Sequence, residues 1–104
     1  MGYFESEMTE VAVAWYTKEE WGKVRVCAAD VEAFSDTYEE WRAKAERTVR
    51  TLRRRGLWIV RLPVTAAELE AWCLEDGVPN TGPNRARFAA RQLDKLRASG
   101  RGPV

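Results

Sequence analysis

One apolar run constrains the fold of this chain more than any other feature. Residues 56–63 read GLWIVRLP: five of the eight are apolar, β-branched and aromatic types among them, with a glycine in front and a proline behind. This composition is typical of a short buried strand. Helical patterns end directly before the run and begin directly after it, so we expect the strand to cross the core with helices packed over it.

A second strand is indicated near the start of the chain. Residues 11–16 alternate large and small side chains, so that Val11, Val13 and Trp15 fall on one side. This is the spacing of a strand, although the intervening alanines leave a helical extension possible. If both strands form, we expect them to pair with each other.

Four helices are expected around the strands. A hydroxyl or carboxylate followed three positions later by a glutamate marks three starts: Thr17 with Glu20, Asp36 with Glu39, and Thr65 with Glu68. Gly56 and Gly77 are placed as left-handed stops, and Pro83 suits the first turn of the last helix. The expected fold class is therefore α+β and mostly helical, with about four helices and a short two-stranded sheet in the order β-α-α-β-α-α.

The 104 residues fit one domain. We expect a disordered lead at residues 1–9, a single globular domain at 10–98 and a flexible tail at 99–104. No apolar stretch approaches the roughly 18 residues that span a bilayer. Cys27 and Cys73 are far apart, and the first ten residues do not resemble a signal peptide, which favours a reducing, cytoplasmic location.

The chain lacks the residues on which several common catalytic and metal-binding sites depend. The chain has no histidine, which removes Ser-His and Cys-His nucleophilic systems and histidine metal sites. Two distant cysteines do not make a structural zinc site by themselves, and no glycine-rich phosphate-binding motif occurs. We therefore expect no catalytic residue, no cofactor and no metal, and a protein that is not an enzyme unless scattered residues assemble a site.

Basic and aromatic residues suggest an anion or small-ligand site as one alternative. Three arginines recur at spacings of three and four on one helix face, and a fourth interrupts the apolar strand. A solvated helix face, and for the strand arginine a local acidic partner, is the interpretation we favour for these arginines. The candidate contacts are Trp41, Arg47, Arg50, Arg54, Trp58, Arg61 and Trp72.

The basic last helix suggests a second alternative, a nucleic-acid-associated regulator. Together with the helix before it, this segment could form a helix-turn-helix, and its candidate contacts are Arg85, Arg87, Arg91 and Lys95. The connection is longer than the usual three to four residues, and Pro83 at the start of the last helix interferes with the motif. The interpretation we favour is a basic solvated helix that covers the core or packs on a second copy.

The first hypothesis is a non-enzymatic protein-interaction or regulatory domain that self-associates. Five tryptophans exceed what this length requires, and the sign of the charge alternates along the chain although the net charge is only +1. A two-stranded sheet also leaves its edges unpaired. We therefore expect a homodimer with an unidentified protein partner.

Several short motifs in the chain are similar to motifs of other proteins. They are Trp15-Tyr16-Thr17, Glu19-Glu20-Trp21, Ala28-Ala29-Asp30, the run from Asp36 to Trp41, and Ala71-Trp72-Cys73. Over roughly residues 15–90 the chain resembles a group of small uncharacterised bacterial proteins. The resemblance implies a bacterial, cytoplasmic, single-domain protein and no particular activity.

Overall fold

The order of elements matches the sequence prediction. The computed structural model describes residues 10–101, with side chains as far as Ala98. The elements are β1 (Glu10–Trp15), α1 (Lys18–Cys27), the short 3-10 helix η2 (Val31–Ala33), α2 (Tyr38–Arg54), β2 (Trp58–Pro63), α3 (Ala66–Asp76) and α4 (Gly82–Arg101). The α+β class is confirmed. The predictions for residues 1–9 and 102–104 lie outside the described residues, and α4 extends to Arg101.

Local chemistry sets most of the helix ends. The Thr65 hydroxyl accepts a hydrogen bond from the backbone N–H of Glu68, whose carboxylate accepts one from the N–H of Thr65 in return. Gly56 and Gly77 have φ angles of 87° and 66°, in the left-handed region that glycine adopts without strain. The predicted stops are therefore confirmed.

The predicted start of α2 is wrong by one residue. The capping hydroxyl belongs to Thr37, which accepts a hydrogen bond from the backbone N–H of Glu40. The Glu40 carboxylate accepts a hydrogen bond from the N–H of Asp36. Threonine caps this helix because its extended backbone directs the hydroxyl at the third amide of the helix.

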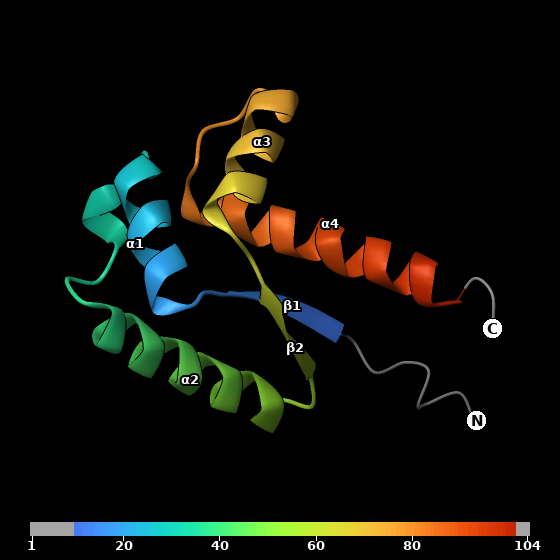
Figure 1. Cartoon of the computed structure of the whole chain (residues 1–104). Helices are drawn as coiled ribbons and strands as arrows, with labels where there is room; N and C mark the ends of the chain where they lie inside the picture. Colours follow the sequence, from blue (N-terminus) through green and yellow to red (C-terminus); the bar gives the residue numbers. More distant parts are fainter. Residues whose placement is uncertain (1–9, 102–104) are drawn as a thin grey trace, which may run out of the picture.

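The two strands pair in parallel. Val11 lies opposite Ile59, Val13 opposite Arg61 and Ala14 opposite Leu62. Parallel strands need a long crossover, and α1 and α2 supply it by carrying the chain from the end of β1 back to the start of β2 (Figure 1). The sheet therefore joins segments almost 50 residues apart in the sequence.

Helices cover both faces of the sheet (Figure 1). On one face, α2 packs over β2 and buries Val49 completely. On the other, α4 packs over β1, where Ala12 and Ala14 contact the main core. α1 and α3 pack side by side beyond the carboxyl ends of the strands. No helix of the described part of the chain is long and apolar enough to cross a membrane.

The main core forms where α1, α3 and α4 meet the sheet. Its fully buried side chains include Val24 of α1 and Leu69 of α3, and it extends to Leu62 of β2 and Phe88 of α4. The apolar run that the sequence places at the centre of the fold is therefore an extended strand with one face in this core.

Candidate functional site

The five indoles occupy different environments. Trp21 and Trp72 are buried in the core, and Trp15 and Trp41 are half-buried with ring centroids 5.4 Å apart. Trp58 is the exposed indole, with 55% of its surface accessible. The predicted ligand contacts Trp41, Trp58 and Trp72 therefore do not share one environment, because Trp41 packs on Tyr16 and Tyr38 while Trp72 packs on Phe88.

Arg61 has an acidic partner within the chain. Its Nη2 donates to Oε1 of Glu46 on α2 at 2.8 Å, and its guanidinium lies 4.3 Å from the centroid of the Trp15 ring. Glu46 also accepts a hydrogen bond from Arg42. Partial burial acts to raise the pKa of Glu46, but the two guanidinium groups outweigh it and lower the pKa. The ion pair between Arg61 and Glu46 thus links β2 to α2.

The other three candidate arginines of the anion site lie on the outer face of α2. Arg47, Arg50 and Arg54 are exposed, and none has an ion-pair partner among the described residues. Arg47 borders a shallow hollow on α2 together with Lys44 and Leu52. These three arginines are therefore separate from Arg61 and from the buried indoles.

The candidate nucleic-acid contacts on α4 divide into two pairs. Arg85 pairs with Asp30, and Arg87 pairs with Asp76 while its guanidinium lies 5.5 Å from the Trp72 ring centroid. Arg91 and Lys95 are exposed on the same helix. Two of the four predicted contacts therefore have their charge balanced by an internal carboxylate.

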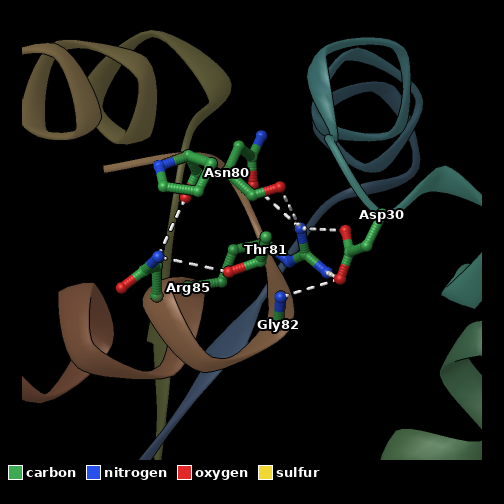
Figure 2. A network of polar contacts seen from close by, with 7 residues as sticks. Asp30, Asn80, Thr81, Gly82 and Arg85 are labelled. Atoms are coloured by element: carbon green, nitrogen blue, oxygen red, sulfur yellow. Dashed lines mark hydrogen bonds and ion pairs between the residues drawn. The ribbon is translucent and has the colours of Figure 1, made fainter. Parts of the chain in front are cut away.

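Arg85 is the centre of the most extensive polar network (Figure 2). Its guanidinium donates to both carboxylate oxygens of Asp30, at 3.0 and 3.1 Å, and to the side-chain oxygen of Asn80 at 2.8 Å. The backbone N–H of Gly82 donates to Asp30 at 2.9 Å, and the N–H of Ala29 donates to the Asn80 carbonyl. The network thereby fixes the loop after α1 against the start of α4.

The same network is largely shielded from water. The Arg85 side chain is 12% exposed, and its guanidinium covers the Phe34 ring at 4.6 Å. The hydrogen bond from Arg85 is the main cause that lowers the pKa of Asp30 below its usual value, while burial acts in the opposite direction. Sequence reasoning missed Asp30 and Asn80 because nothing in their local spacing points to Arg85.

A groove runs along the free side of β1. It has a volume of about 370 Å³ and is lined on its floor by Ala12 and Ala14, with Trp41 and Lys44 of α2 and Ala86 of α4 beside them. Tyr16 and Phe34 also line the groove. Burial raises the pKa of Tyr16 to about 12, and its carbonyl accepts a hydrogen bond from the Tyr38 hydroxyl. The sequence predicts a free sheet edge but not this enclosure.

Neither cysteine has the surroundings of a reactive thiol. Cys27 donates to the Glu70 carboxylate at 2.6 Å, and this hydrogen bond raises its pKa. Burial raises the pKa of Cys73. A reactive thiol needs a lowered pKa, so neither environment favours thiolate chemistry. No group of three or more potential metal-ligating residues occurs within residues 10–101.

Comparison with known proteins gives no match to a family model, a curated protein or a solved structure.

Proposed function

We propose that this protein is a non-enzymatic protein-interaction domain that self-associates as a homodimer. The observation that carries the proposal is the exposure of Trp58, since the other four indoles are buried or half-buried. Tryptophan side chains supply much of the binding energy at protein interfaces, because they bury a large apolar area with few rotatable bonds.

Trp58 lies at the start of β2, at the end of the sheet that α4 reaches through Arg97. Trp58 lies opposite Glu10 in the strand register, and the Glu10 carboxylate forms an ion pair with Arg97 of α4. The exposed indole therefore marks one corner of the molecule, which we call the Trp58 corner, and a two-fold axis there would bury the indole of each copy.

Internal pairing of charges favours this function over the two alternatives. Arg61 and Arg85 each have a carboxylate partner, so an incoming phosphate would have to compete with Glu46 or Asp30 for them. Arg91, Lys95 and the arginines on α2 remain exposed, but they lie on two separate helices. An exposed indole is better suited to a protein surface than to a polyanion.

Light scattering over a range of micromolar concentrations tests the proposal. We expect a mass near twice 11.9 kDa for the unmodified protein. Trp58→Ser should shift the protein toward the monomer and weaken association at least about tenfold, because interface tryptophans contribute 2 kcal/mol or more.

Leu74→Ser is the matched control for this experiment. Leu74 is 82% exposed on α3, away from the Trp58 corner, so its replacement should leave the mass unchanged. A monomeric unmodified protein at all concentrations would refute self-association. A dimer that Trp58→Ser leaves intact would show that another surface holds the copies together.

A further inference from the structure

The two edges of the sheet differ in their capacity to accept another strand. The carbonyl of Trp15 accepts a hydrogen bond from the N–H of Val64, so the backbone polar groups of Trp15 point toward β2. These groups alternate in direction along a strand, and those of Ala12 and Ala14 therefore point away from β2. No third strand pairs with them in the described part of the chain. β1 thus presents unpaired donors and acceptors.

The outer edge of β2 is less suitable for pairing. By the same alternation, the residues of β2 whose backbone points outward are Ile59, Arg61 and Pro63. Pro63 has no N–H to donate, and the Arg61 side chain crosses to Glu46 on α2. Prolines and charged side chains are features that protect sheet edges from pairing. The β1 edge carries alanines and valines instead, so it is the edge open to strand addition.

The shape of the β1 edge favours a slender occupant. The edge forms the floor of the groove, and α2 and α4 lie on opposite faces of the sheet on either side of it (Figure 1). A paired strand must approach to about 4.8 Å. Two copies of the same recessed edge would meet at their helices before their strands came that close, whereas one extended segment can enter the groove.

The lining of the groove also favours particular side chains in a bound segment. None of the described residues that line it is acidic, and Lys44 on its rim has no ion-pair partner among the described residues. Arg85 also borders the groove, but Asp30 balances its charge. At one end, the half-buried rings of Phe34 and Trp41 offer aromatic surface to a bulky apolar side chain.

We propose that the free edge of β1 binds an extended segment of a partner protein by strand addition, with an acidic side chain near Lys44 and a large apolar side chain at the aromatic end. Main-chain hydrogen bonds to Ala12 and Ala14 provide affinity, and the flanking side chains provide selectivity. The inference rests on the proposed interaction function but uses a surface other than the Trp58 corner.

A display library of random ten-residue peptides is a suitable probe. We expect enrichment of sequences that combine an acidic residue with a large apolar residue and lack proline at the centre. Ala12→Pro removes one outward N–H, and prolines at such edge positions are tolerated. We expect it to weaken binding of the selected peptides at least about tenfold, because it removes a hydrogen bond and adds bulk at the floor of the groove.

Charge reversal on α2 provides a second pair of variants. Lys44→Glu should weaken binding roughly fivefold or more, since it places like charges together. Arg50→Glu makes the same change in charge on the outer face of α2 and should leave binding unchanged. Lys44→Glu also keeps the test decisive if Ala12→Pro fails to fold, because an exposed helix position tolerates the change.

The outcomes separate this inference from the proposed function. Selected peptides that bind Ala12→Pro and Lys44→Glu as tightly as the unmodified protein, or a library that yields no binders, would overturn the β1 site. Light scattering would still report self-association independently in either case. A fall to the monomer mass in folded Ala12→Pro would show that a second copy occupies the edge, which would also overturn the peptide proposal.

Discussion

Arg61 and Arg85 illustrate how a single charged residue can hold two elements together. Each guanidinium lies against an aromatic ring and donates to a carboxylate from another part of the chain, Glu46 for Arg61 and Asp30 for Arg85. Arg85 is the less exposed of the two and makes more hydrogen bonds. Because a partly buried charge is costly without its partner, the Asp30 network should contribute measurably to stability.

The network predicts a specific pH dependence. The folded-state pKa of Asp30 is lowered, so its stabilising contribution is complete above the unfolded pKa of about 3.9 and is lost as pH falls through the folded pKa. Asp30→Asn should reduce the free energy of unfolding at pH 7 by about 2 kcal/mol. Urea unfolding between pH 7 and 2.5 should show the variant losing less stability than the unmodified protein as pH falls.

A matched control for this prediction lies on α4. Asp94 is exposed and has no ion-pair partner among the described residues, so Asp94→Asn should stay within about 0.5 kcal/mol of the unmodified protein at pH 7. Parallel stability curves for Asp30→Asn and the unmodified protein across the acidic range would contradict the role assigned to the Asp30 carboxylate.

At the scale of elements, the sequence predicts those helix ends that are determined by neighbouring residues. Helix caps depend on neighbouring residues, which is why the Thr65 box and the stops at Gly56 and Gly77 are predictable. The start of α2 is less predictable. Asp36 and Thr37 are each followed three positions later by a glutamate, and the backbone geometry decides which of them caps the helix. The partners of Arg61 and Arg85 are not predictable in this way, because tertiary packing brings together residues 15 and 55 positions apart.

Helix α3 offers a direct test of which face is buried. Leu69 is fully buried, whereas Leu74 on the same helix is 82% exposed. Leu69→Ala should lower the free energy of unfolding by about 3 kcal/mol, because it leaves a cavity in the core. Leu74→Ala should change it by no more than about 0.5 kcal/mol. Similar losses from both variants, measured by urea unfolding, would mean that α3 packs differently.

At the scale of the whole molecule, the order of elements is predictable from the sequence but the surfaces are not. The parallel register, and with it the outward direction of Ala12 and Ala14, emerges only once β1 and β2 are paired. Helices cover the faces of the sheet and leave it open at β1 and at the Trp58 corner, the two surfaces proposed for binding.

Self-association through the Trp58 corner can be measured by amide hydrogen exchange at low and high protein concentration. The segment containing Trp58 should become protected as concentration rises, while those containing Val26 and Leu74, which are apolar and more exposed than Trp58, should not change. Exchange that is independent of concentration everywhere, or protection that appears on α1 and α3 instead, would contradict it.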